Sequence, residues 1–130
     1  MSVVYVDTSV LGRVLVGEAD KPAIKKSLDS FDQVVSSRLL RVELRRLGLL
    51  RDLLDAAGEL LSEVALISPD DTLLTTAETI PPATVRTLDA IHLTTAVKLA
   101  KADELDAVMT YDKQLAAGAR EHGLTVLSPS

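Results

Sequence analysis

Several residue types that mark particular protein classes are absent or rare in this sequence. It has 130 residues, no cysteine and no tryptophan, and only two tyrosines and one phenylalanine. Without cysteine, a disulfide-stapled fold, a thiolate zinc site and a cysteine nucleophile are all excluded. The two histidines do not make a histidine-rich metal site. So few aromatic side chains also argue against a module that binds single strands by stacking bases on aromatic rings.

Long apolar runs and targeting features are missing as well. No apolar stretch approaches the length needed to span a bilayer. The amino terminus has no basic region before an apolar stretch and no small-residue cleavage site, so we expect no signal peptide and a cytoplasmic protein. Six glycines and five prolines are too few for a disordered or collagen-like chain. The length fits one domain that covers residues 1–130.

The charge balance is acidic, but the basic residues are unevenly distributed. The formal net charge is −5, which argues against a plain nucleic-acid binder. If four carboxylates were gathered in one metal site, the rest of the chain would carry only −1. Five of the 14 basic residues fall within one short stretch: Arg38, Arg41, Arg45, Arg46 and Arg51. By default they form a solvated helix face, and the alternative is a surface for RNA or for an acidic partner.

Short apolar runs alternate with helical patterns along the whole chain. The apolar and β-branched runs predict strands at 3–6, 33–36, 64–67, 107–110 and 124–127. The helical patterns cover about 10–16, 21–30, 37–57, 70–78, 84–102 and 113–122, and Gly48 or Gly58 offers a break in the longest of them. Strands that alternate with helices indicate an α/β fold, with a parallel sheet of about five strands and crossover helices on both faces.

Two acidic residues occupy positions where the helical pattern calls for apolar side chains. Glu43 falls in the middle of the apolar side of its helix, whose members are Leu39, Leu40, Leu44, Leu47, Leu50 and Leu54. Asp89 lies within an apolar side made by Leu88, Leu93, Ala96, Val97, Leu99 and Ala100. Burying an ionised carboxylate without a partner costs several kcal/mol or more. Each therefore needs a partner of positive charge, either a buried basic side chain or a metal ion. Arg86, near Asp89, is the only basic residue close to these apolar sides.

Two further acids follow predicted strands. Asp7 comes directly after the first strand, and Asp112 comes after the fourth, with Thr110 on the same side of the extended chain. In open α/β sheets, ligands bind outside the carboxyl ends of the strands, where the strand order reverses. We therefore expect Asp7, Glu43, Asp89 and Asp112 to converge on one pocket, although Asp7, Ser9 and Asp112 are also ordinary helix caps. Ser9 can cap a helix and orient Asp7 at once.

The ligand type indicates the chemistry of such a pocket. A cluster with oxygen ligands alone selects hard cations, Mg²⁺ or Mn²⁺, rather than Zn²⁺. Such an ion can activate a bound water and offset the charge on a leaving oxygen, which makes phosphodiester hydrolysis a natural reaction. The sequence has no Gly-x-Ser-x-Gly motif, so nothing supports acyl transfer.

Four short motifs together connect the sequence to a known family. They are Val-Asp-Thr-Ser at 6–9, Val-Glu-Leu at 42–44, Leu-Asp-Ala-Ile-His-Leu at 88–93 and Thr-Tyr-Asp at 110–112. In this order and spacing the chain resembles the PIN-domain ribonucleases, and specifically a VapC-type toxin of a type II toxin–antitoxin pair. The resemblance implies a three-layer α/β/α fold, a Mg²⁺- or Mn²⁺-dependent endoribonuclease that leaves a 3′-hydroxyl and a 5′-phosphate, a cognate antitoxin and a homodimer.

The residues around these motifs divide into expected roles. Asp7 and Asp89 are the first choices as direct metal ligands, and Asp112 and Glu43 complete the catalytic site directly or through water. Ser9, Thr110 and Arg86 are candidates to support the site or to contact RNA, and His92 is interpreted as a core histidine. The acids at 103–106 compete with Asp112 but precede the strand. Two other functions stay open: a receiver-type phosphoacceptor that binds Mg²⁺, and a non-catalytic scaffold that binds a partner.

Overall fold

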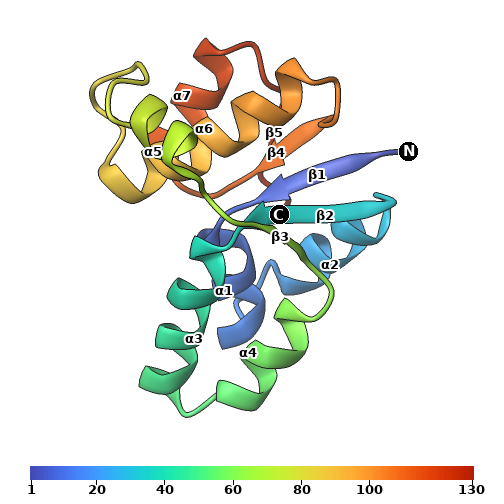
Figure 1. Cartoon of the computed structure of the whole chain (residues 1–130). Helices are drawn as coiled ribbons and strands as arrows, with labels where there is room; N and C mark the ends of the chain where they lie inside the picture. The colour runs from blue at the N-terminus through green and yellow to red at the C-terminus, as the bar shows by residue number, and fades with distance from the viewer.

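A parallel five-stranded sheet runs through the centre of the protein (Figure 1). The computed structural model describes residues 1–130 in full. The strands are β1 (Val3–Val6), β2 (Gln33–Ser37), β3 (Ala65–Ile67), β4 (Ala107–Met109) and β5 (Val126–Leu127), in the spatial order β3-β2-β1-β4-β5. Every neighbouring pair is parallel. The central strand β1 is buried along its whole length.

Seven helices cover the two faces of this sheet, which makes three layers. They are α1 (Thr8–Val16), α2 (Lys21–Asp29), α3 (Leu39–Arg51), α4 (Leu54–Leu61), α5 (Asp71–Ala77), α6 (Thr87–Lys101) and α7 (Lys113–Glu121). Successive strand residues point to opposite faces. Val4 and Val6 pack with residues of α1 to α4, whereas Val3 and Tyr5 pack with Ala96 of α6. Helix α7 packs onto α6 in a smaller cluster. The predicted α/β/α architecture is confirmed.

The strand order decides between two of the functions left open by the sequence. Strands β2 and β3 lie beside one edge of the central strand β1, and β4 and β5, which come later in the chain, lie beside its other edge. The order therefore reverses between β1 and β4. Receiver modules have the order 2-1-3-4-5 instead. The receiver alternative is consequently wrong for this chain.

The long helical pattern at 37–57 is two helices, and its break lies at neither predicted glycine. Helix α3 ends at Arg51, the C-cap residue Asp52 adopts a left-handed conformation with φ 57°, and α4 begins at Leu54. The predicted apolar side is also shifted, because Leu50 is 79% exposed. Leu40 and Leu44 carry the buried face. No helix of the protein is both long enough and apolar enough to cross a membrane.

Helix α6 is buried on more sides than its sequence pattern predicts. Thr94, which is not part of the predicted apolar side, is buried, and Leu88, which is part of it, is half exposed. The helix packs against the sheet, α5 and α7, so its central turns from His92 to Val97 are all buried. A helix covered in this way has no single apolar stripe by which sequence periodicity could place its faces.

Gly48 allows α3 and α4 to approach each other closely. A Cβ added at Gly48 would lie 3.1 Å from the Leu53 carbonyl oxygen and 3.1 Å from the Ala57 Cβ. That carbonyl accepts a hydrogen bond from the Ala57 N–H at 2.9 Å, so it has little freedom to move. We expect Gly48→Val to lower the free energy of unfolding by about 1–3 kcal/mol through overpacking.

Gly58 provides the matched control for this prediction. A Cβ there would meet only the Arg45 guanidinium, at 3.8 Å. Gly58→Ala should therefore stabilise the protein by up to about 1 kcal/mol, because alanine is the better helix former. Urea denaturation of both variants checks the pair, and a Gly48→Val protein as stable as the wild type would contradict the close approach of α3 and α4.

Candidate active site at the carboxyl ends of strands β1 and β4

The site lies where the strand order reverses. In the parallel register Val6 of β1 is paired with Met109 of β4. The residues that follow these partners, Asp7 and Thr110, therefore lie side by side at the carboxyl edge of the sheet. The acids at 103–106 lie at the other edge, where the Asp106 carboxylate accepts a hydrogen bond from the Val3 N–H at 2.7 Å. This placement favours Asp112 over them as the fourth acid.

Asp7 is buried and held by two hydroxyl groups. It is 3% exposed. Ser9 Oγ donates to Asp7 Oδ1 at 2.6 Å, and Thr110 Oγ1 donates to Asp7 Oδ2 at 2.9 Å. Asp7 occupies the N-cap position of α1, but its side chain makes no capping hydrogen bond. Burial raises the pKa of Asp7, the two hydroxyl donors oppose this rise, and the charge of Asp112 adds to it.

Asp89 and Asp112 lie near each other, and each is at the amino-terminal end of a helix. Asp112 caps α7, since its Oδ1 accepts the Leu115 N–H at 2.8 Å. Asp89 lies in the first turn of α6. Burial, then the nearby Asp112 and the charge of Asp7, raise the pKa of Asp89 to about 6. The charges of the three aspartates therefore repel one another.

The alternative in which Asp89 is buried against Arg86 is wrong. The protein contains two ion pairs, Arg13 with Asp20 and His92 with Glu43, and neither involves Asp89. Arg86 is exposed at the N-cap position of α6. No basic side chain of the protein therefore neutralises the three aspartates by an ion pair.

Glu43 lies beside this group rather than within it. Its Oε1 accepts a hydrogen bond from Thr8 Oγ1 at 2.7 Å and lies 2.9 Å from His92 Nε2. Burial would raise the pKa of Glu43, but the hydrogen bonds from His92 and Thr8 outweigh it and hold this pKa below its usual range. The side chain is 24% exposed, so Glu43 lies on the flank of the apolar face of α3 and not in its middle.

Three polar residues around the acids were missed or understated by the sequence analysis. Thr8 follows Asp7 and binds Glu43, and His92 lies one turn after Asp89 and also binds Glu43. The sequence carries one signal for His92, because residues three apart lie on the same face of a helix. Tyr5, buried in β1, binds the other side of the His92 ring. The interpretation of His92 as a satisfied core histidine agrees with its 1% exposure.

The donor set fits a hard divalent cation, although the side chains do not form a finished chelate. Asp7, Asp89 and Asp112 supply only oxygen atoms, and their mutual repulsion is what a divalent ion would relieve. No three acidic or histidine side chains are gathered closely enough to hold an ion directly. Both Asp7 oxygens and one Asp112 oxygen already accept hydrogen bonds. This arrangement fits Mg²⁺, which keeps several of its waters.

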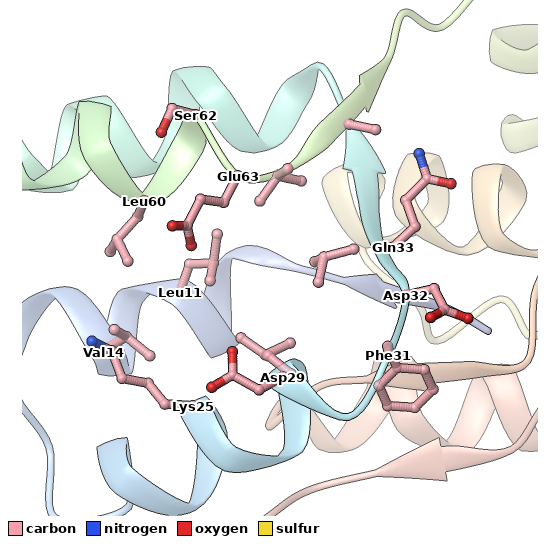
Figure 2. Close-up of a pocket in the computed structure, with 14 residues that line it drawn as sticks. Leu11, Val14, Lys25, Asp29, Phe31, Asp32, Gln33, Leu60, Ser62 and Glu63 are labelled. Carbon is pink, nitrogen blue, oxygen red and sulfur yellow. The ribbon is translucent and has the colours of Figure 1, made fainter. Parts of the chain in front are cut away.

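Two other surface features lie apart from the acids. A cavity of about 750 Å³ opens between α1, α2, α4 and the amino ends of β2 and β3, at the edge of the sheet opposite to the site (Figure 2). It is lined by none of the four site acids. A shallow groove on the outer surface of α3 is lined by Arg38, Arg41, Arg45 and Arg46, and none of these arginines forms an ion pair. Their solvated face agrees with the default expectation from the sequence.

Comparison with known proteins identifies the family. A family model described as the PIN domain matches residues 4–121. The chain belongs to the PIN-domain family. This confirms the resemblance carried by the four motifs, all of which lie within the matched residues.

Curated relatives of this PIN-domain protein match it along its whole length. Ribonuclease VapC47 of Mycobacterium tuberculosis is 35% identical over 97% of this chain and 96% of its own. Ribonuclease VapC46 of the same organism is 33% identical over 100% of both chains. The relatives are thus of the same size as this chain and carry the name of one ribonuclease group.

Solved structures support the same fold at lower sequence identity. A toxin–antitoxin complex from Klebsiella pneumoniae matches 98% of this chain and 98% of its own, with a TM-score of 0.75 and 19% identity. The Mycobacterium tuberculosis toxin VapC20, described as cleaving the sarcin–ricin loop, matches 88% of this chain and 93% of its own, with a TM-score of 0.69 and 20% identity. At these sequence identities the two matches support a shared fold and nothing more.

The raised pKa of Asp89 predicts how the stability of the metal-free PIN-domain protein depends on pH. A carboxyl whose pKa is higher folded than unfolded binds more protons in the folded state between the two values, so stability falls as the pH rises through that window. For Asp89 this window runs from its ordinary pKa near 3.8 up to about 6. Asp89→Asn should flatten the stability profile there and leave the protein about 1 kcal/mol more stable at pH 7, after discounting for the partial exposure of the carboxyl.

Urea denaturation in EDTA at pH 5 and pH 7 measures this difference. Asp29→Asn, which changes an exposed aspartate whose side chain makes no hydrogen bond, is the matched control and should follow the wild type. A large loss of stability in Asp89→Asn at pH 7 would mean that Asp89 has a favourable partner in the folded protein.

Proposed function

We propose that this PIN-domain protein is a metal-dependent endoribonuclease of the VapC type and the toxin of a toxin–antitoxin pair. One observation carries the proposal: Asp7, Asp89 and Asp112 repel one another at the point where the strand order reverses, with no cation paired to them. Full-length relatives that are named ribonucleases support the reaction class. Mutual repulsion offers no benefit to folding, so the acids serve a ligand of positive charge.

The contacts of each site residue suggest its role in the proposed reaction. Asp7, Asp89 and Asp112 would hold Mg²⁺ or Mn²⁺, and Glu43 completes the site from its flank. When bound, such an ion supplies an activated water and offsets charge on the scissile phosphate. Ser9 and Thr110 keep the Asp7 carboxylate in one orientation. Arg86, which is exposed one turn before Asp89, would contact an RNA phosphate.

The proposed function includes a protein partner and a cellular location. The structural match to a toxin–antitoxin complex supports a protein antitoxin as the regulator of this chain. We propose further that residues 1–130 act as one domain, that two copies form a homodimer, and that the protein acts on cytoplasmic RNA.

The first test is the response of thermal stability to metal. About 10 mM Mg²⁺ or Mn²⁺ should raise the Tm above its value in EDTA, because an ion that binds only the folded state shifts unfolding by mass action. At ten times its Kd the ion stabilises the fold by about 1.4 kcal/mol, which corresponds to a rise of a few degrees. Asp89→Asn should lose most of this rise. An unchanged Tm with both ions would count against a metal site.

The second test is cleavage of RNA. With Mg²⁺ or Mn²⁺ the wild type should cut a mixture of single-stranded and structured RNAs, and EDTA should stop it. Asp7→Asn and Asp89→Asn should each lower the rate by about 100-fold or more, because each removes a proposed ligand of the ion, and even partners outside the ligands contribute up to about 100-fold. Asp29→Asn should cut at the wild-type rate.

A folded wild type that binds metal but cuts none of these RNAs would favour the non-catalytic scaffold. The metal titration and the cleavage assay therefore separate a failed metal site from a failed nuclease.

A further inference from the structure

His92 is the most extensively bonded side chain around the site that the proposed reaction leaves without a role. It is 1% exposed, and both nitrogens of its ring have a partner. Nε2 lies 2.9 Å from Glu43 Oε1, and Nδ1 lies 2.6 Å from the Tyr5 hydroxyl. The Tyr5 and His92 rings also meet edge to face, with centroids 5.7 Å apart. The imidazole therefore connects the central strand to the acid on α3.

The neighbours of Tyr5 determine which ring nitrogen carries the proton. The Tyr5 hydroxyl already accepts the Ser37 backbone N–H at 3.1 Å. Its own proton then has His92 Nδ1 as acceptor, since burial raises the pKa of Tyr5 and keeps it protonated. A neutral histidine that accepts at Nδ1 carries its proton on Nε2, which faces the Glu43 carboxylate. The hydrogen-bond network thus selects one tautomer of His92.

The bonds to Glu43 share one oxygen of its carboxylate. Thr8 Oγ1 and His92 Nε2 both contact Oε1. The other oxygen, Oε2, has no hydrogen bond within the chain and is not a buried unsatisfied atom, so solvent reaches it. Glu43 is consequently anchored through Oε1 and presents Oε2 for a further contact. Both anchors are next to site acids, because Thr8 follows Asp7 and His92 lies one turn after Asp89.

We propose that His92 is a positioning residue of the active site: it donates from Nε2 to Glu43 Oε1, with its ring held by Tyr5, and so presents Glu43 Oε2 to the ion or the attacking water. The inference rests on the proposed function for its catalytic consequence and on the hydrogen-bond geometry for the tautomer. Hydrogen-bond partners of this kind, outside the metal ligands themselves, commonly contribute 10- to 100-fold to metal affinity or activity.

The tautomer is tested on the wild-type protein without metal or RNA. Long-range proton–nitrogen NMR correlations of the histidine rings distinguish protonated from bare ring nitrogens, and His122→Gln assigns the two histidines by loss of one set of signals. We expect a proton on His92 Nε2. A bare Nε2 would overturn the proposal whether or not the protein cuts RNA.

Kinetics test the consequence. His92→Phe keeps a ring in the core and removes the donor, so kcat on RNA should fall by about 10- to 100-fold with KM little changed. His92→Gln, whose amide can donate to Glu43, should recover part of this loss. Thr94→Val is the matched control on the same helix: it removes a buried hydroxyl that bonds only the Ala90 carbonyl, and kcat should stay at the wild-type value.

A double-mutant cycle shows whether His92 acts through Glu43. In a Glu43→Gln background, His92→Phe should cause no further loss of kcat, because the carboxylate that it positions is gone. Equal losses in both backgrounds, or full activity of a folded His92→Phe protein, would overturn the proposal. If His92→Phe does not fold, the His92→Gln cycle and the NMR measurement decide. A wild type that cuts no RNA would instead refute the proposed function and leave the tautomer as the test of His92.

Discussion

The pairing of Asp7 with Ser9 and Thr110 is the interaction on which the rest of the site depends. It places a carboxylate with 3% exposure at the end of the fully buried central strand, where an ionised group without partners would cost several kcal/mol. The two hydroxyls come from different elements, since Ser9 belongs to α1 and Thr110 follows β4. Ser9 Oγ also accepts the Tyr111 N–H, and Thr110 Oγ1 accepts the Asp112 N–H. The backbone that leads to Asp112 is therefore aligned by the same hydroxyls that hold Asp7.

This arrangement shows how a small α/β protein can keep acids together that repel one another. Asp112 caps α7 and Asp89 lies in the first turn of α6, so the partial positive charge of a helix amino end offsets part of the repulsion at each. Asp7 relies on hydroxyl donors, and Glu43 on His92 and Thr8. These contacts do not fully offset the burial and the mutual repulsion of the acids, because the pKa values of Asp7 and Asp89 remain raised. A divalent ion is the ligand that would remove the remaining cost.

The two sides of the site differ in how they are built. The aspartate side follows from strand ends and helix starts, which the backbone places at one edge of the sheet. The Glu43 side depends on a chain of hydrogen bonds that runs from the Ser37 backbone N–H through the side chains of Tyr5 and His92. That chain joins both faces of the sheet, because Tyr5 and His92 pack on the α6 side while Glu43 comes from α3 on the other. Buried networks of this kind favour one arrangement when every member has a partner.

Much of the fold and part of the site follow from the sequence by itself. The alternation of strands and helices and the positions of Asp7 and Asp112 after strands are local patterns, so periodicity and strand ends suffice to find them. Only the tertiary structure decided that the chain breaks at Asp52, because the close approach of α4 to Gly48 is a contact between helices. It also decided that Glu43 lies on a flank and that His92 binds it. Those two residues are 49 positions apart, and Tyr5 and His92 are 87 apart, so no local pattern records that they meet. Their contact depends on how the sheet orders its strands and on which face each helix covers, and that is determined by packing of the whole chain.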